Sequence, residues 1–85
     1  MTWCLYVVRC SDQTLYTGIT NDIEKRVEKH NAGTGAKYTR PRRPVRLLVT
    51  WPYADRSAAS KAEYRFKKNT RAQKLAFIKN PETWT

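Results

Sequence analysis

The sequence predicts an α+β domain in which a three-stranded, mostly antiparallel sheet is flanked by helices, in the order ββαβαα. Three short β-branched and aromatic stretches predict the strands, and three capped stretches with helical spacing predict the helices. The 85 residues are enough for one small core, and a hydrophobic fraction of 40% is too high for a charged disordered tail. We therefore expect residues 1–85 to form a single domain.

Two stretches near the N-terminus predict a β-hairpin. Residues 3–10 and 15–20 are rich in aromatic and β-branched side chains, and four polar residues separate them. Because side chains alternate between the two faces of a strand, Tyr6 lies on one face of the first strand, and Tyr16 and Gly18 share a face of the second. If these faces coincide, two phenols lie close together. A simple aromatic contact across the strands, contributing ~0.2–1 kcal/mol, is the alternative.

The first predicted helix follows the hairpin directly. An N-cap residue with a glutamate three positions later begins it, and it runs from Asn21 to Asn31. Ile23 and Val27 are spaced to form its buried stripe, whereas Arg26 and His30 leave the helix together on a neighbouring polar stripe. Taken singly, each of these two polar residues could equally be a surface side chain or a satisfied polar contact.

The middle of the chain predicts a loop and then the third strand. Residues 33–39 contain two glycines and predict a mobile loop, and the prolines within 40–44 favour extended backbone. Residues 45–51 are again β-branched and aromatic, and Pro52 is expected to end that strand.

Two helices are predicted in the last third of the chain. Ser57 is a plausible N-cap for a helix that runs to about Asn69. Thr70 and Gln73 have the spacing of a capping box, which begins a final helix that stops before Pro81.

The positive charge of the chain indicates a polyanionic partner. Seventeen Lys and Arg against seven Asp and Glu give a net charge of +10, and the stretch from Lys29 to Ala54 contains six basic residues and no acid. Nucleic acid is the first candidate, because each neutralised phosphate releases counterions. A solvated basic surface is the alternative, and a membrane-binding helix is disfavoured by the glycines and prolines. The residues expected to bind nucleic acid are Lys37, Arg40, Arg42, Arg43 and Arg46.

The sequence also predicts a cytoplasmic protein. It contains neither a run of about 20 apolar residues nor the pattern of a secretory signal peptide. Cys4 and Cys10 fall in one predicted strand, about 20 Å apart at ~3.4 Å per residue, which is too far for a disulfide bond and is consistent with a reducing compartment.

Several of these residues together resemble the motifs of a known family. Cys4-Leu5-Tyr6 on the first strand, Tyr16-Thr17-Gly18 on the second, Arg26 and His30 on the first helix and Glu63 on a later one form the pattern of a GIY-YIG nuclease domain. The resemblance spans roughly residues 3–79 and is closest to the small stand-alone members of that family. It implies a DNA endonuclease that cleaves phosphodiester bonds with one divalent cation, Mg²⁺ or Mn²⁺. Relatives that act in excision repair or on branched DNA make damaged and branched DNA candidate substrates.

The resemblance also implies a role for each matched residue. Glu63 would bind the metal ion, and Arg26 would stabilise the transition state by forked hydrogen bonds to phosphate. Tyr16 would act as the general base toward the attacking water, directly or through a relay. Tyr6 would orient water or phosphate, and His30 would share in the proton transfers.

Glu63 has a simpler interpretation as well. It is spaced to form an i,i+4 ion pair with Lys67, which would contribute only tenths of a kcal/mol. However, it is the only acid between Asp55 and Glu82 in a stretch otherwise rich in Lys and Arg. A single carboxylate in a positive field is what a nucleic-acid nuclease requires.

Two other functions remain open. A cysteine stands where the GIY motif has its glycine, and the asparagine that many members carry after the glutamate has no match, which favours a nucleic-acid-binding accessory protein with the same fold. A ribosome- or RNA-associated basic protein would explain the charge but not the clustered motif residues. The chain lacks the targeting module of larger members, so a protein partner is expected to supply any sequence selectivity, and nothing in the sequence indicates the oligomeric state.

Overall fold

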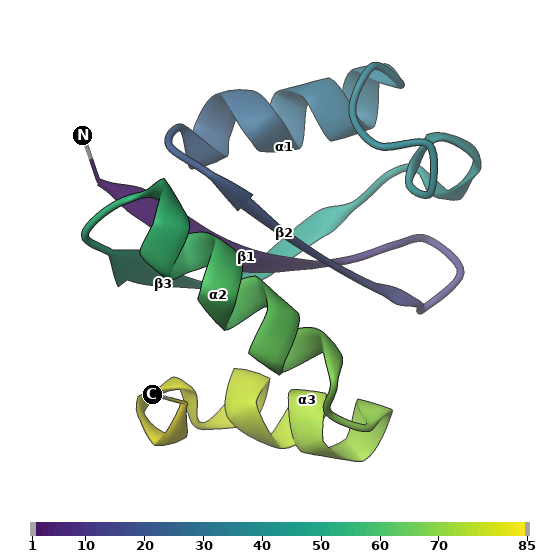
Figure 1. Ribbon diagram of the computed structural model, residues 1–85. Helices are drawn as coiled ribbons and strands as arrows, with labels where there is room; N and C mark the ends of the chain where they lie inside the picture. The colour runs from purple at the N-terminus through teal and green to yellow at the C-terminus, as the bar shows by residue number, and fades with distance from the viewer. Residues whose placement is uncertain (1, 85) are drawn as a thin grey trace.

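The computed structural model describes residues 2–84 and confirms the predicted fold class. Its elements follow in the order ββαβαα with two added 3₁₀ turns: β1 (Trp3–Arg9), β2 (Leu15–Thr20), α1 (Ile23–Ala32), η1 (Arg40–Arg42), β3 (Arg46–Tyr53), α2 (Arg56–Lys67), α3 (Arg71–Lys79) and η2 (Pro81–Thr83). The three strands form one antiparallel sheet in the order β2-β1-β3. Figure 1 shows α1 on one side of this sheet and α2, followed by α3, on the other. No helix within these residues is long and apolar enough to cross a membrane.

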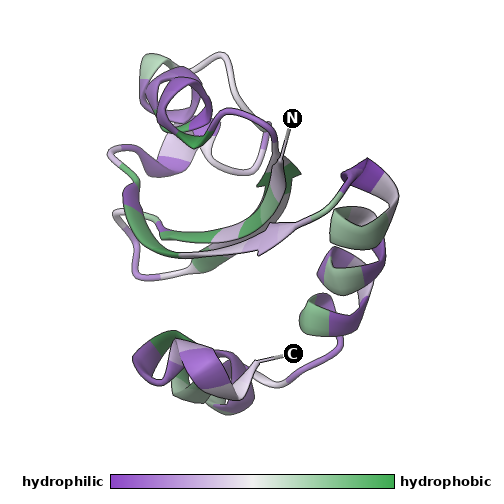
Figure 2. Ribbon diagram, turned by 90° about the vertical axis from the view of Figure 1, so that its left-hand side faces the viewer, coloured by the Kyte–Doolittle hydropathy of each residue, from purple (hydrophilic) through white to green (hydrophobic). Residues whose placement is uncertain are grey.

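The sheet separates two small cores, as the alternation of side chains along β1 requires. Leu5 and Val7 point toward α2 and pack with Phe66, whereas Tyr6 and Val8 point to the α1 side. In Figure 2 the sheet is largely coloured as hydrophobic, and the helices carry both apolar and polar residues. Tyr6 therefore lies in the core under α1, and the helices that follow β3 pack on the opposite face.

The third strand is longer than the sequence predicted. Pro52 does not end it: β3 continues to Tyr53, and Pro52 is aligned with Cys4 of β1. Because β3 is at the edge of the sheet, its outer hydrogen-bonding groups have no partner strand, and a proline that lacks N–H is tolerated there.

The helix boundaries also differ from those predicted. Asp22, not Asn21, caps α1 by accepting a hydrogen bond from the Lys25 amide at 3.2 Å. Asp55, not Ser57, caps α2 by accepting from the Ala58 amide at 2.8 Å, and α2 ends at Lys67. A carboxylate is as good an N-cap as a hydroxyl, so α2 begins after the earlier acid, whereas α1 begins one residue later than predicted. The capping box at the start of α3 is confirmed.

The segment between α1 and β3 is a hydrogen-bonded connection. The predicted extended backbone at 40–44 is replaced at Arg40–Arg42 by the 3₁₀ turn η1. Gly33 ends α1 with φ of 84°, a left-handed conformation that glycine adopts readily. Thr39, within this connection, is fully buried, and its amide donates to the Ala36 carbonyl at 3.2 Å. This packing carries Thr39 to the side chain of His30.

Candidate functional site

Three of the site residues expected from the sequence form one hydrogen-bonded chain. His30 Nε2 lies 2.8 Å from Tyr6 Oη, and Arg26 Nε donates to the same phenol oxygen at 3.2 Å. Tyr6 comes from β1, whereas Arg26 and His30 are one turn apart on α1, so the polar stripe predicted for this helix faces the predicted tyrosine. Tyr6 and His30 are fully buried. The sequence led us to expect that Tyr6 orients water or phosphate, and the structure leaves none of its surface exposed to either.

A threonine determines which nitrogen of His30 carries the proton. Thr39 Oγ1 lies 2.8 Å from His30 Nδ1 and donates its own proton to the Ala36 carbonyl at 3.0 Å. A hydroxyl has one proton, so toward His30 it can only accept, and Nδ1 must be the protonated nitrogen. In the neutral imidazole, Nε2 is then an acceptor, and the Tyr6 hydroxyl donates to it.

The electrostatics of the buried groups agree with this assignment. Burial raises the pKa of Tyr6 to about 12, with the nearby Arg26 charge acting in the opposite direction. Burial, reinforced by the positive charge of Arg26, lowers the pKa of His30 below its ordinary value of 6.5. The hydrogen bond to Tyr6 raises the pKa of Arg26, with a further contribution from Tyr16. At neutral pH the chain therefore consists of a charged arginine, a neutral phenol and a neutral imidazole.

Two glycines make room for this chain. A Cβ atom on Gly18, which is aligned with Tyr6 across the hairpin, would lie 2.6 Å from Tyr6 Oη. A Cβ atom on Gly35 would lie 2.6 Å from His30 Nδ1 and 2.9 Å from the His30 Cα. Both distances are too short for carbon, so each glycine allows a close approach that a side chain would block.

Tyr16 lies at the more accessible end of the cluster. Its ring centroid is 6.4 Å from that of Tyr6 and 5.2 Å from that of His30, the latter in an edge-to-face arrangement. The two phenols therefore lie on one face of the sheet, which the sequence had left open. Unlike Tyr6, Tyr16 is only partly buried and lines a surface hollow of 280 Å³ with Lys67. Tyr16 and Arg26 are thus the members of the cluster that solvent can reach.

Glu63 approaches the cluster from the opposite side of the sheet. It lies on α2, and its negative charge is near enough to the Tyr6 phenol to oppose loss of the phenolic proton. Its side chain is 23% exposed and forms the predicted i,i+4 ion pair, with Lys67 Nζ 3.1 Å from Glu63 Oε2. The structure thus joins Tyr6, Arg26 and His30 directly and places Glu63 within electrostatic range of Tyr6.

The chemistry of Glu63 fits a divalent cation held by one protein ligand. Within residues 2–84, no three His, Cys, Asp or Glu side chains gather where they could hold a metal ion together. Mg²⁺ commonly takes one or two carboxylates and keeps water and substrate phosphate as its other ligands. Glu63 could hold Mg²⁺ or Mn²⁺ in this way, provided that the ion displaces the ammonium group of Lys67.

The arginines expected to bind nucleic acid are largely engaged within the chain. Arg40 Nε donates to the Gly33 carbonyl at 3.1 Å, and Arg43 Nη1 to the Asn31 carbonyl at 3.2 Å, at the C-terminal end of α1. Lys37 is exposed, and Arg46 lies exposed at the start of β3. Two of these cations, Arg40 and Arg43, are therefore tied to carbonyls at the C-terminal end of α1.

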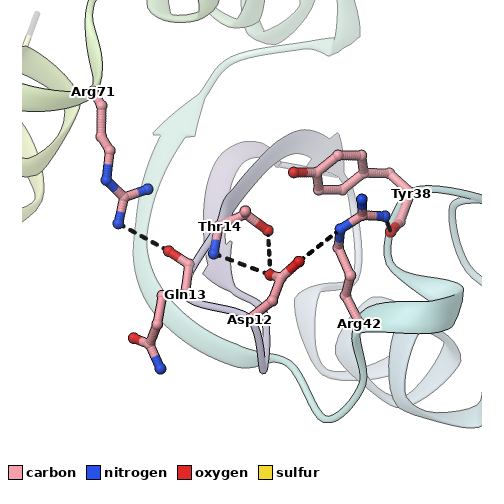
Figure 3. Close-up of polar contacts among 6 residues, drawn as sticks. All are labelled: Asp12, Gln13, Thr14, Tyr38, Arg42 and Arg71. Atoms are coloured by element: carbon pink, nitrogen blue, oxygen red, sulfur yellow. Dashed lines mark hydrogen bonds and ion pairs between the residues drawn. The ribbon is translucent and has the colours of Figure 1, made fainter.

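Arg42 has a third kind of internal contact, which joins two loops. Its Nε lies 2.9 Å from Asp12 Oδ2 in the β1–β2 turn, and its Nη1 donates to the Tyr38 carbonyl at 2.8 Å (Figure 3). Its guanidinium also lies 4.1 Å from the centroid of the Tyr38 ring, and that ring stacks on Tyr16 at 6.0 Å. Arg42 therefore holds the Tyr38 ring in its position against the ring of Tyr16.

Three residues that shape the site could not be predicted from the sequence. Thr39 and Gly35 act on His30 across a connection whose path depends on tertiary packing, and Tyr38 is an ordinary loop tyrosine in the sequence. Thr39 is fully buried, and a buried polar side chain needs a hydrogen-bond partner, but its burial is not visible in the sequence.

The chain matches a known protein family over most of its length. The family model described as the GIY-YIG catalytic domain matches residues 2–76. A UPF0213 protein of Staphylococcus aureus (strain Mu50) is 53% identical over 75 residues, covering 88% of this chain and 92% of the relative.

Two solution NMR structures are similar throughout the fold. The protein EF2693 from E. faecalis is 45% identical, with a TM-score of 0.67 over 98% of this chain and 88% of that one. The UPF0213 protein BH0048 from Bacillus halodurans is 39% identical, with a TM-score of 0.60 over 93% and 84% of the two chains. With the family model matching over most of its length, this chain belongs to the GIY-YIG nuclease family, whose members generally use divalent metal ions and act on nucleic acid.

Proposed function

We propose that this protein is a divalent-metal-dependent endonuclease that hydrolyses phosphodiester bonds in DNA, with damaged or branched DNA as its preferred substrates. The observation that supports it best is the chain from Arg26 through Tyr6 to His30, which fixes the arginine beside the accessible Tyr16. A buried chain that only stabilised the fold would not need to end in a partly exposed guanidinium next to a second phenol.

The residues divide the reaction between them. Arg26 binds the scissile phosphate and neutralises the charge that develops on its oxygens in the transition state. Tyr16 acts as the general base: its phenol oxygen takes a proton from the attacking water as the water oxygen bonds to phosphorus, and the hydroxyl proton of Tyr16 passes to solvent. The bond from phosphorus to the leaving oxygen breaks, and that oxygen takes a proton from solvent. A metal ion bound at Glu63 would supply Lewis-acid stabilisation of the phosphate when present.

Tyr6 and His30 contribute by positioning. The Tyr6 phenol stays protonated because burial raises its pKa to about 12, so it cannot be the base that activates water at neutral pH. It accepts from Arg26 Nε and donates to His30, which fixes the direction of the guanidinium. Arg26 is thereby held in one rotamer before the substrate arrives.

The accessory-protein alternative is favoured by one contact. Lys67 Nζ lies 3.1 Å from Glu63 Oε2, so the carboxylate already has a positively charged partner without a metal ion. In this alternative the fold binds nucleic acid, and the ion pair is only structural.

The two functions are distinguished by Glu63→Gln. The parent and this variant are incubated with supercoiled, single-stranded and branched DNA in Mg²⁺, in Mn²⁺ and in EDTA, and binding is measured on the same DNA. We expect metal-dependent nicking by the parent and its collapse in the variant, while binding is equal or tighter because a negative charge has been removed. Absence of nicking by the parent on every DNA, or equal nicking by the variant, supports the accessory protein.

A further inference from the structure

Two adjoining surface hollows continue outward from Tyr16. The first, of 280 Å³, is lined by Leu15, Tyr16, Thr17, Tyr38, Lys67 and Lys74. The second, of 230 Å³, is lined by Thr14, Leu15, Tyr38, Arg71 and Lys74. They share three residues and therefore form one groove between β2, the loop at Tyr38 and helices α2 and α3. We refer to this surface as the α3 groove.

The α3 groove is positively charged along its length. Its linings contain Lys67, Arg71 and Lys74 and no carboxylate. The nearby acids are already engaged, since Glu63 pairs with Lys67 and Asp12 with Arg42. Lys74 is half-buried between the two hollows, and it has no carboxylate partner among residues 2–84. An ammonium group in a groove without counter-charge is suited to an external anion.

Arg71 is held at the outer end of this groove. Its Nη2 donates to the Gln13 carbonyl in the β1–β2 turn at 2.8 Å, so the side chain reaches from α3 across to the hairpin (Figure 3). A guanidinium has five N–H donors, and this bond uses one of them. The remaining donors stay available to a phosphate in the groove.

We infer that a nucleic-acid strand reaches the candidate site along the α3 groove, with successive phosphates on Arg71, Lys74 and Lys67 before the scissile phosphate at Arg26. This inference rests on the proposed function, which makes Arg26 the ligand of the scissile phosphate. It assigns the nucleic-acid-binding face to α2 and α3. The 37–46 segment is less suited to this task, because Arg42 is already paired with Asp12 and Arg43 uses two of its donors on carbonyls of its own chain.

The test measures binding to a fluorescein-labelled three-way DNA junction by anisotropy, in EDTA, over a range of salt concentrations. Arg71→Ala/Lys74→Ala removes two groove cations, and each lost phosphate contact makes the slope of log K against log salt shallower by ~0.9, about 1.8 for the pair. Lys37→Ala/Arg40→Ala removes the same two residue types from the 37–46 segment and should leave the slope unchanged. Lys79→Ala, on α3 but outside the groove lining, should also leave it unchanged. Lys74→Ala alone, which breaks no internal bond, should give half of the effect even if the double variant is unstable.

Each outcome separates this inference from the proposed function. An unchanged slope in Lys74→Ala and in the double groove variant, or an equal loss in Lys37→Ala/Arg40→Ala, overturns the groove even when the parent nicks DNA. A parent that binds through the groove but never nicks DNA supports the groove and overturns the endonuclease. A parent that binds no DNA overturns both.

Discussion

His30 Nδ1 donates its proton to Thr39 Oγ1 over 2.8 Å, and this one contact determines the tautomer of the imidazole. Since Nε2 is left as an acceptor, the Tyr6 proton points to His30, and the phenol oxygen presents its lone pairs to Arg26. The direction of every bond in the chain follows from a threonine that touches neither Arg26 nor any surface hollow described above.

Thr39→Val should therefore change the state of His30 without removing it. Valine preserves the shape of the side chain and takes away the acceptor for Nδ1–H, which leaves a buried donor unsatisfied and costs about 1–3 kcal/mol of unfolding free energy. The chain contains one histidine, so its two ¹⁵N resonances can be assigned without ambiguity. In the parent we expect the Nδ1–H tautomer, and in the variant a shift toward Nε2–H together with slower cleavage.

Thr39→Ser provides the control for this experiment, because it restores the hydroxyl and loses only a methyl group. It should return the Nδ1–H tautomer and most of the cleavage rate. An Nε2–H tautomer in the parent would contradict the assigned direction of the chain.

Acidification should destabilise the fold over the pH range in which His30 takes up a proton in the unfolded chain but not in the folded one. Its pKa in the folded protein is lowered by burial and by Arg26, so below about pH 6.5 the unfolded chain binds a proton that the folded chain does not. The free energy of unfolding therefore falls as pH drops from 7 to 5. Protonated Nε2 would also compete with the Tyr6 proton, which has no second acceptor among the contacts described. Urea unfolding at pH 7 and pH 5 measures the effect, and His30→Gln should flatten it; a parent with equal stability at both values would contradict it.

Gly18→Ala should disturb the site from the edge strand. The added Cβ would lie 2.6 Å from Tyr6 Oη and 2.8 Å from Cζ, so the ring must move or the strands must separate, at a cost of about 1–3 kcal/mol. In a Tyr6→Phe background the nearest atom is absent, and the cost of the same substitution should be smaller. A double-mutant cycle by urea unfolding measures the difference. Equal costs in both backgrounds would show that the strand, not the phenol, requires glycine.

The strands and helices could be predicted because their signals are local. Alternation along β1 placed Tyr6 on the face away from Leu5, and helical spacing placed Arg26 beside His30. The errors arose where one local signal competed with another or with tertiary context. Asp55 began α2 before Ser57 could, and Pro52 was accommodated because its strand is at the edge of the sheet.

The site itself depended on contacts that no local pattern contains. Tyr6 was expected to orient water or phosphate, but it is completely buried on the α1 side of the sheet, and its hydroxyl bonds to Arg26 instead. The arginines of the 37–46 segment looked available in the sequence, but helix-terminal carbonyls such as that of Asn31 need donors, and Arg43 supplies one. Charge in a sequence thus indicated the class of partner without locating the face that meets it.

Lys67 connects the proposed metal ligand with the proposed nucleic-acid groove. It pairs with Glu63 at 3.1 Å and lines the groove beside Tyr16. Lys67→Ala should free the carboxylate, so that the metal concentration for half-maximal nicking falls. A partly exposed ion pair contributes about 0.2–1 kcal/mol, which corresponds to a fall of about 1.4- to 5-fold. The same variant should bind DNA more weakly, with a salt slope shallower by ~0.9.

Lys74→Ala is the matched control for this last experiment, since it removes the same charge from the groove without touching Glu63. It should weaken DNA binding to a similar extent and leave the metal requirement unchanged. Titrating Mn²⁺ at saturating DNA, and DNA at saturating Mn²⁺, resolves the two effects for each variant. If Lys67→Ala raised the metal requirement, the ammonium group could not be a competitor of the cation, and Glu63 would have to be replaced as the metal ligand in the proposed mechanism. Opposite shifts in Lys67→Ala, with only the DNA shift in Lys74→Ala, would place the metal and the strand on the two sides of one side chain.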